Sequence, residues 1–374
     1  YGEDGAQMNP EDTDVVLGFI EKQTDYLGAP VPTEEQRSKF IKAVPSSVDR
    51  KYYKALTKLT LSKKAVKQYG KTLKLVYTPV HGSGYIPVTT ILKKIGIHVY
   101  VVEEQTVKDP DFSTVKVPNP EFKETLSMGI ALAEKVGATV VFGTDPDSDR
   151  LGVAVKNKSG EFEALSGNQV GILLLDYILT RLKEDGKLPA NAAVVKSFVS
   201  TGMAAAICKK FGVTMFETPV GFKFIGDKIK QWEKDGKYTF VFGFEESCGY
   251  LHGTHARDKD AVVASMLCAE MVCYYESKNK TVSERLEEIY KEYGYVLDKN
   301  ISIQYSGLNA MKEMNAVVDA LKTKPVSKFD IYKVAYIRDY SKNVKTEVAT
   351  GKTFEIGSPT TNCVYYELEN GSFI

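Results

Sequence analysis

Short apolar runs alternate with longer amphipathic stretches along the first half of the chain, and this pattern predicts strands and helices in turn. Strands are expected at 73–77, 98–102 and 139–142, and helices at 88–95 and, after a proline-rich turn, within 119–136. Because strands separated by helices pair in the same direction, these elements predict an α/β unit with helices on the faces of its sheet.

The same rhythm restarts in the second half of the chain. The expected strands are 192–195, 213–217 and 238–242. The expected helices are 170–184, 224–234, 260–276 and 282–293. A further helix should end at Phe211, with Ser200 and Thr201 as candidates for its N-cap. In each half an apolar strand ends in FG and a carboxylate follows closely, which indicates a weak internal repeat. Since ligands of such sheets bind beyond the carboxyl ends of the strands, the two acidic loops are expected to face one another across a cleft.

These elements define the expected domains. The fold class is α/β, with tandem α/β/α domains that have mixed or mostly parallel sheets, and with a partial α+β domain at the C-terminal end. The boundaries are 1–44 for a polar tail and linker, 45–165 and 166–299 for the two α/β domains, and 300–374 for the last domain. Each α/β domain is expected to fold around its own core.

Composition narrows the class of protein. A chain of 374 residues is too long for a single core, and its net charge of +1 gives no bulk attraction to nucleic acid or membrane. No apolar run approaches the ~18 residues of a membrane-spanning helix. The five cysteines are scattered without a CxxC pair, which predicts free thiols in the cytoplasm.

The segment GTDPDSDR, at 143–150, carries the most informative chemistry in the chain. Asp145, Asp147 and Asp149 alternate in a short turn after an apolar strand, and Arg150 follows at once. Oxygen ligands held this close together indicate a divalent cation, and magnesium is expected. A merely solvated acidic turn is the alternative. An EF-hand is excluded, because its sixth and twelfth positions, counted from Asp145, hold Arg150 and Lys156 instead of Gly and Glu.

The segment GFEESCGY, at 243–250, is a second candidate site. Glu245 and Ser247 can together accept from and donate to neighbouring sugar hydroxyls, whereas the alternative is the acidic start of a helix. In ARDKDA, at 256–261, Arg257 and Lys259 stand before a helix and indicate an anion there, with a solvated basic turn as the equal alternative.

Two glycine-containing turns complete the set of candidate segments. TPVGFK, at 218–223, offers Gly221 and the cation Lys223 after a strand. TPVHGSG, at 78–84, either cradles a phosphate or closes a tight joint between strand and helix. His81 in that turn is interpreted as a hydrogen-bonded turn residue in preference to a catalytic base.

Taken in order, these segments resemble those of the α-D-phosphohexomutase family, the phosphoglucomutases and phosphomannomutases. The matching pieces are TPVHGSGY, PNPE at 118–121, GTDPDSDR, LSGNQVG at 165–171, TPVGFK, GFEESCGY and ARDKDA. The resemblance covers essentially the whole chain. The form GFEESCGY is most similar to the longer subgroup, which includes phosphoglucomutases and phosphopentomutases.

The resemblance implies a four-domain enzyme that moves phosphate between C1 and C6 of a hexose phosphate, glucose 1-phosphate and glucose 6-phosphate. A phosphoserine and a bisphosphosugar intermediate carry the phosphate, and Mg²⁺ and an activator of the glucose 1,6-bisphosphate type are required. The other readings are a phosphomannomutase or phosphopentomutase, a haloacid-dehalogenase-type phosphatase, and a non-enzymatic sugar-phosphate binding protein. The phosphatase reading is weakened because Asp149 stands where that class has Thr or Val.

The resemblance also assigns roles to residues. The three aspartates would hold magnesium together with the phosphoserine, and Arg150 would act in catalysis by steadying the transferred phosphoryl group. The residues implied in substrate binding are Glu245, Ser247, Arg257, Lys259, Gly221 and Lys223. The implied partner is a phosphosugar, without nucleic acid or membrane, and the oligomeric state stays open.

The chain departs from the family pattern at three places. It has neither a serine loop of the TASHNP type nor a phosphate loop of the RxSGTEP type. We therefore expect a fragment that lacks most of the first domain and the end of the fourth, with 1–44 as the tail of the first domain, and that is inactive alone. Gly249 stands where many members have histidine, so the general acid and base stay unassigned, with His252 and His255 as nearby substitutes.

Overall fold

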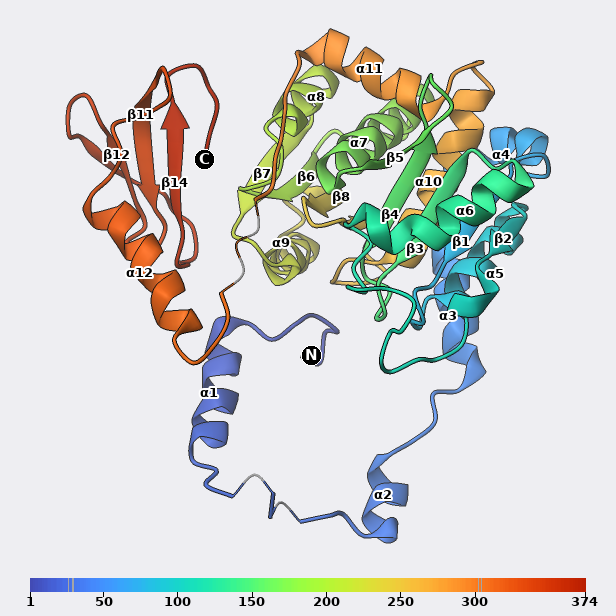
Figure 1. Cartoon of the computed structure of the whole chain (residues 1–374), viewed down its shortest axis with the longest axis horizontal. Coiled ribbons are helices and arrows are strands. Elements are labelled where there is room, and N and C mark those ends of the chain that lie inside the picture. Colours follow the sequence, from blue (N-terminus) through green and yellow to red (C-terminus); the bar gives the residue numbers. More distant parts are fainter. Residues whose placement is uncertain (26, 29, 302, 304) are drawn as a thin grey trace. The chain divides into compact units, whose positions relative to one another are not determined.

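The computed structural model describes residues 1–25, 27–28, 30–301, 303 and 305–374. The chain divides into two compact units, Tyr1–Val296 and Leu297–Ile374 (Figure 1). In the described part of the chain, no helix combines the length and the apolar character needed to cross a membrane.

Four helices precede the first sheet. They are α1 (Pro10–Glu21), α2 (Glu34–Phe40), α3 (Ser46–Lys58) and α4 (Lys63–Tyr69). The side chain of Asn9 caps α1 by accepting a hydrogen bond from the Asp12 amide, but neither α1 nor α2 has a buried residue. In contrast, α3 packs on α5 and α4 packs on α10, so the continuous α/β body begins at α3.

The first sheet has the strand order β2-β1-β3-β4-β5. Its strands are β1 (Leu75–Thr78), β2 (Val99–Val101), β3 (Val140–Thr144), β4 (Leu151–Lys156) and β5 (Phe162–Leu165). The helices between them are α5 (Tyr85–Ile95), η1 (Glu103–Gln105), η2 (Lys123–Leu126) and α6 (Ser127–Val136). Strand β1 pairs in parallel with β2 and β3, whereas β4 is antiparallel to both of its neighbours. The sheet is therefore mixed, as expected.

The second sheet repeats this order as β7-β6-β8-β9. Its strands are β6 (Ala192–Ser197), β7 (Thr214–Thr218), β8 (Thr239–Glu245) and β9 (Gly249–His252). The helices of this half are α7 (Gly167–Glu184), α8 (Met203–Phe211), α9 (Phe222–Asp235), α10 (Ala261–Glu276) and α11 (Val282–Tyr293). In both sheets a parallel trio of strands is followed by an antiparallel strand, which is the internal repeat that the sequence indicates.

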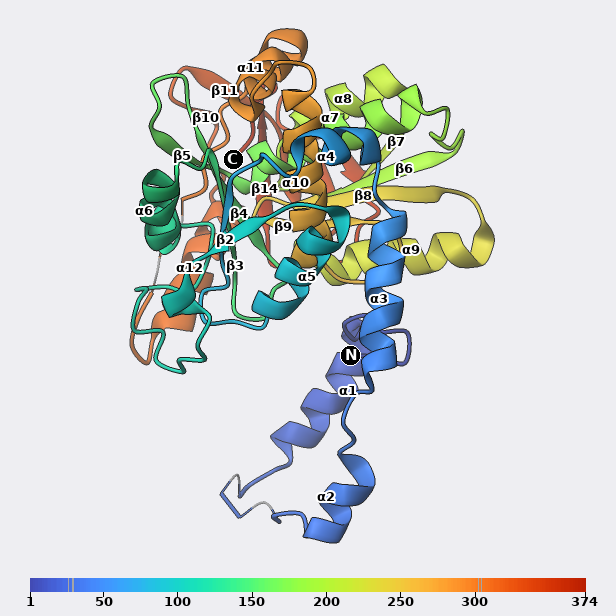
Figure 2. The same cartoon turned by 90° about the vertical axis from the view of Figure 1, so that its right-hand side faces the viewer.

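Helix α10 joins the two halves. It is apolar around almost its whole circumference, and it packs on α4, α5 and β4 of the first half and on α7, β9 and α11 of the second (Figure 2). One continuous hydrophobic cluster accordingly runs from Leu56 through Phe142 and Phe244 to Ile289. The expectation that each α/β domain has its own core holds only in part. A smaller cluster built on Val76, Leu126 and Val141 lies within the first domain, whereas the largest cluster is shared between the two.

The predicted N-cap of α8 is also wrong. The helix has Gly202 at its N-cap, without a hydrogen bond from a capping side chain. The hydroxyl of Thr201 accepts from the Met203 amide, and the hydroxyl of Ser200 is instead bonded to the distant residue Glu246. A contact between residues far apart in the sequence has replaced the local cap.

The second unit is an α+β fold. It contains α12 (Ala310–Thr323), β10 (Lys328–Phe329), β11 (Tyr332–Asp339), β12 (Val344–Glu347), β13 (Thr353–Glu355) and β14 (Val364–Leu368). Strand β11 pairs antiparallel with β10, β12 and β14, and β12 pairs antiparallel with β13. Its small core is built on Val334, Tyr366 and Leu368.

Candidate active site

The acidic loop is the tight connection between β3 and β4. Its folding depends on Asp145, whose Oδ1 atom accepts from the backbone amides of Asp149 at 3.0 Å and Arg150 at 2.9 Å. These hydrogen bonds curl the loop, so that one carboxylate oxygen from each of Asp145, Asp147 and Asp149 lies within 4.8 Å of the others. The structure thus brings the three predicted metal ligands together.

The charge of this loop is only partly offset by the chain. Burial raises the pKa of Asp145 to about 7, and although the Arg150 amide lowers it, the nearby carboxylates of Asp149 and Asp147 raise it further. The Arg150 Nε atom lies 3.7 Å from Asp145 Oδ2 and 3.8 Å from Asp149 Oδ1, which is longer than a hydrogen bond. A set of converging oxygens with too little positive charge fits a divalent cation such as magnesium.

The glycine-rich turn after β1 packs against the acidic loop. A Cβ atom on Gly82 would lie 2.5 Å from the Cα atom of Pro146, and the Ser83 amide donates to the Pro146 carbonyl at 2.8 Å. Gly82 is therefore needed for close backbone approach. The His81 ring is bonded to the Val107 carbonyl at 2.7 Å and so serves as a turn residue. Of the two readings of this segment, the tight joint is the one that the contacts favour.

The loop with Glu245 connects β8 to β9 as a turn, so the alternative of an acidic helix start is wrong. Glu245 is buried, and its Oε1 atom accepts from the Gly221 amide at 2.6 Å. Burial raises the pKa of Glu245 to about 7, although the Gly221 amide lowers it, and the carboxylate of Glu246 raises it further. Ser247 is half-buried in the same turn. Two predicted substrate-binding loops, those of Gly221 and Glu245, are thus in direct contact.

Lys259 reaches the acidic loop by crossing Gly249. A Cβ atom on Gly249 would lie 2.7 Å from the Cδ atom of Lys259, so a larger residue there would push this lysine stem aside. The Lys259 Nζ atom lies 2.5 Å from Asp149 Oδ2 and 3.4 Å from Asp258 Oδ1. The basic segment and the metal loop therefore share an ion pair.

The other predicted cations have local partners. Arg257 donates to Glu233 at 2.5 Å, and its Nη1 atom is buried and has no hydrogen-bond partner among the described residues. The ammonium of Lys223 lies 5.1 Å from the centroid of the Phe224 ring, which is within the range of a cation–π contact.

The two acidic loops meet through backbone contacts. Arg150 and Gly249 form an antiparallel bridge, and the Leu151 amide donates to the Cys248 carbonyl at 3.0 Å. The Ala261 amide donates to the Ser148 carbonyl at 3.2 Å. The loops that end equivalent strands of the two sheets are therefore held at a fixed distance by peptide groups.

A pocket of about 720 Å³ lies beside these loops. Asp147 and Asp149 line it together with Arg257 and Lys259, so acidic and basic predicted site residues share one hollow. The remaining predicted residues lie outside its lining in the described part of the chain; these are Asp145, Arg150, Gly221, Lys223, Glu245 and Ser247.

The two histidines near this site are engaged in the fold. His252 is buried, its Nδ1 atom donates to the Val241 carbonyl at 2.6 Å, and burial lowers its pKa to about 4. The Nε2 atom of His255 lies 2.8 Å from the Asp260 carboxylate, and Asp260 also caps α10. His252 is therefore a neutral structural residue, whereas His255 lines the pocket but is oriented by Asp260.

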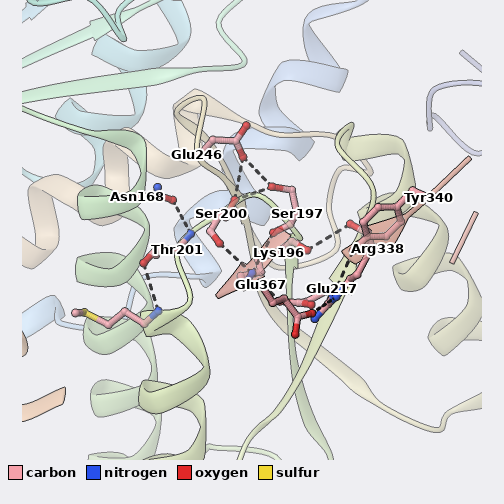
Figure 3. A network of polar contacts seen from close by, with 12 residues as sticks. Asn168, Lys196, Ser197, Ser200, Thr201, Glu217, Glu246, Arg338, Tyr340 and Glu367 are labelled. Atoms are coloured by element: carbon pink, nitrogen blue, oxygen red, sulfur yellow. Dashed lines mark hydrogen bonds and ion pairs between the residues drawn. The ribbon is translucent and has the colours of Figure 1, made fainter. Parts of the chain in front are cut away.

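Sequence reasoning missed a polar cluster behind the Glu245 loop. It consists of Lys196, Ser197, Ser200 and Glu246, which come from the ends of β6 and β8 (Figure 3). A signal was present, since serines at the end of a predicted strand stand where the first half has TPVHGSG. Their partner, however, lies 46 to 49 residues further along the chain and has no local signature.

Comparison with known proteins shows the family to which the chain belongs. The family models described as phosphoglucomutase/phosphomannomutase, alpha/beta/alpha domain II and domain III match residues 50–160 and 166–293. A phosphoglucomutase of Staphylococcus aureus (strain USA300) is 31% identical over 373 residues, which are 99% of this chain and 65% of that protein. The chain belongs to the phosphoglucomutase/phosphomannomutase family.

Solved structures show the same architecture. A putative phosphomannomutase from Thermus thermophilus is 26% identical with a TM-score of 0.52, over 65% of this chain and 50% of that one. The open form of pp63/parafusin, a phosphoglucomutase from Paramecium, is 18% identical with a TM-score of 0.55, over 87% and 53%, and this likeness concerns the fold alone. The chain thus spans about two thirds or less of the relatives named here.

Proposed function

We propose that this protein acts as a magnesium-dependent phosphosugar mutase that interconverts glucose 1-phosphate and glucose 6-phosphate through a phosphoserine and a bisphosphosugar intermediate. The observation that carries the proposal is the convergence of Asp145, Asp147 and Asp149 beside Arg150, with Lys259 at the same loop. Phosphoryl transfer depends mainly on positioning and on neutralising charge, and these residues are of the types that do both.

In this proposal the three aspartates hold Mg²⁺, which supplies positive charge against the transferred phosphoryl group. Arg150 donates hydrogen bonds to that group, since its guanidinium is held only loosely by Asp145 and Asp149 and is one-third exposed. No serine of this chain is assigned as the phosphate acceptor, and no residue is assigned as general acid or base.

The sugar would bind between the loops of the second α/β domain. We assign Glu245 and Ser247 to the sugar hydroxyls, and Gly221 and Lys223 to the neighbouring wall. The direct contact between the Gly221 amide and Glu245 supports placing both in one subsite. Arg257 and Lys259, which line the common pocket, are assigned to the phosphate that is not being transferred.

Glucose is proposed as the sugar because the similar proteins of Staphylococcus aureus are phosphoglucomutases. The activator is then glucose 1,6-bisphosphate. Mannose and pentose phosphates are the alternatives that a direct comparison must test. We place the protein in the cytoplasm, which its five free thiols support, and expect no nucleic-acid or membrane partner at its near-neutral charge.

The domain assignment is part of the same proposal. Residues 45–165 and 166–299 would be the second and third mutase domains, 300–374 part of the fourth, and 1–44 the tail of the first. The matched segments at 50–160 and 166–293 and the boundary between units after Val296 support these limits.

The test measures turnover of the natural protein with glucose, mannose and ribose 1-phosphates, each with its bisphosphate and Mg²⁺. The expected result is the highest kcat/KM with glucose 1-phosphate, and loss of turnover in the Arg150→Met variant. A higher kcat/KM for another sugar phosphate would identify that sugar, and not glucose, as the preferred substrate. Tight sugar-phosphate binding without any turnover would show that the protein is a binding protein and not an enzyme.

A further inference from the structure

Glu246 lies between the two residues assigned to the sugar, yet its carboxylate is directed to the neighbouring loop. The Ser197 hydroxyl donates to Glu246 Oε2 at 2.7 Å, and the Ser200 hydroxyl donates to the same oxygen at 3.0 Å (Figure 3). The two hydroxyl oxygens are 2.7 Å apart, and both serines are fully buried. A carboxylate that receives two buried hydroxyls is held in one position.

The loop that carries these two hydroxyls is itself held in place by Lys196. Lys196 is buried to 1% exposure, and its ammonium donates to the carbonyls of Ser200 at 3.0 Å and Ser197 at 3.2 Å. It also forms an ion pair of 2.9 Å with Glu217. Because an unpaired buried ammonium is costly, this lysine stabilises the one loop conformation that satisfies it.

The backbone of Glu246 is held from the opposite side by α7. A Cβ atom on Gly167 would collide with the Glu246 carbonyl oxygen, so the first residue of α7 packs directly on the turn. The Tyr250 hydroxyl donates to the Gly167 carbonyl at 3.2 Å, which ties β9 to the same point. Both the side chain and the backbone of Glu246 are therefore fixed.

We propose that Glu246 is a positioning residue for the sugar subsite. It holds the turn between Glu245 and Ser247 through Ser197 and Ser200, and it does not contact the sugar itself. This inference rests on the proposed function, because it concerns how the assigned sugar contacts are held. Direct contact between Glu246 and the sugar is the competing possibility, and the test separates the two.

The experiment measures the affinity of the natural protein for glucose 1,6-bisphosphate at saturating Mg²⁺ by titration calorimetry. Glu246→Ala should weaken binding by about tenfold or more, and Ser197→Ala/Ser200→Ala should do the same from the other side of the contact. Glu246→Gln should restore part of the affinity, because its amide oxygen still accepts from a serine hydroxyl. Glu163→Ala, at an exposed position on β5, is the matched control and should have no effect.

A double-mutant cycle decides between positioning and direct contact. If Glu246 acts through its neighbours, Glu246→Ala should cause no further loss of affinity in a Glu245→Ala/Ser247→Ala background. Independent, multiplied losses would show a separate role for Glu246 and overturn the proposal. An unchanged affinity in the Glu246→Ala variant, or a loss that Glu246→Gln does not relieve at all, would also overturn it.

The same cycle shows which idea has failed. If Glu245→Ala/Ser247→Ala itself leaves the affinity unchanged, the assignment of the sugar loop in the proposed function is wrong, and the inference falls with it. If that double variant binds weakly while Glu246→Ala binds normally, only the positioning role is lost.

Discussion

At the scale of single residues, the acidic loop holds three carboxylates close together despite the repulsion between their negative charges. Asp145 is buried and committed to two backbone amides, whereas Asp147 is exposed and makes no hydrogen bond that builds the loop in the described structure. The first residue therefore shapes the loop, while the second is free to serve a ligand. Substituting Asp147 should remove function without removing the fold.

The change Asp147→Asn should weaken magnesium binding by about tenfold or more, because one anionic ligand becomes neutral. Circular dichroism and the unfolding midpoint should stay as in the unchanged chain. Calorimetric titration with MgCl₂ measures the affinity, and turnover of the natural protein should be lost in parallel. Full turnover of this variant at limiting magnesium would contradict the assignment of the metal ligands.

Gly249 makes a second prediction at this scale. In the Gly249→Ala variant the new methyl group must displace the stem of Lys259, which the structure places 2.7 Å from it. Lys259 should then leave Asp149. Affinity for glucose 1,6-bisphosphate should fall by about tenfold, because the assigned contact between Lys259 and a phosphate of this ligand is lost. If the methyl group acts through Lys259, adding Gly249→Ala to Lys259→Met should change the affinity no further. A full additional loss in that double variant would show another cause.

At the scale of helices and strands, α10 carries an acid into the core. Glu270 is fully buried, and its carboxylate accepts from the backbone amides of Leu61 and Ser62 at the start of α4. Burial raises the pKa of Glu270 to about 7, and these two amides lower it only in part. The contact between α4 and α10 is therefore sensitive to pH.

The sign of this dependence follows from the direction of the shift. A folded-state pKa above the ordinary value of 4.5 stabilises the protein fully below pH 4.5, and this stabilisation is lost as the pH rises to about 7. The change corresponds to about 3 kcal/mol as an upper bound. Urea denaturation should show the wild type exceeding Glu270→Gln in unfolding free energy by more at pH 5 than at pH 8. Asp145 and Glu245 titrate in both proteins and cancel. An equal difference at both pH values would contradict the prediction.

Sequence patterns were sufficient where the decisive contacts are local. Helix α11 spans 282–293 as predicted, because Thr281 and Glu284 form a capping box and Gly294 ends the helix. The acidic loop is likewise contained in consecutive residues. The cap of α8 was predicted wrongly because Ser200 bonds to Glu246, 46 residues away. The short strands β5 and β9 were missed since a few residues carry little periodicity.

At the scale of the whole molecule, the first unit depends on a core that the two α/β domains share. Leu151 and Val155 of the first sheet belong to the same hydrophobic cluster as Leu173 of α7 and Met266 of α10. Separating the two domains would expose apolar surface to water, which is energetically costly. The two domains should therefore stay together even when the chain between them is cut.

A protease site inserted between Leu165 and Ser166, where the first α/β domain ends and Ser166 is exposed, tests this expectation. After cleavage the two pieces should elute together in gel filtration at the volume of the uncut chain, and they should separate only in denaturant. The control is the same chain without protease treatment. Separation of the pieces in native buffer would show that the shared core does not hold the two domains together.

The backbone bridge between Arg150 and Gly249 has a consequence for how such proteins change over time. The distance between the acidic loop and the sugar loop is set by backbone N–H and C=O groups, and every residue except proline has both. Side chains that do not hold the shape of their own loop, such as that of Ser247, can therefore be exchanged during evolution without disturbing the spacing between the loops. New sugar preferences are open to this architecture through point substitutions alone, while the relation of the loops to one another is inherited intact.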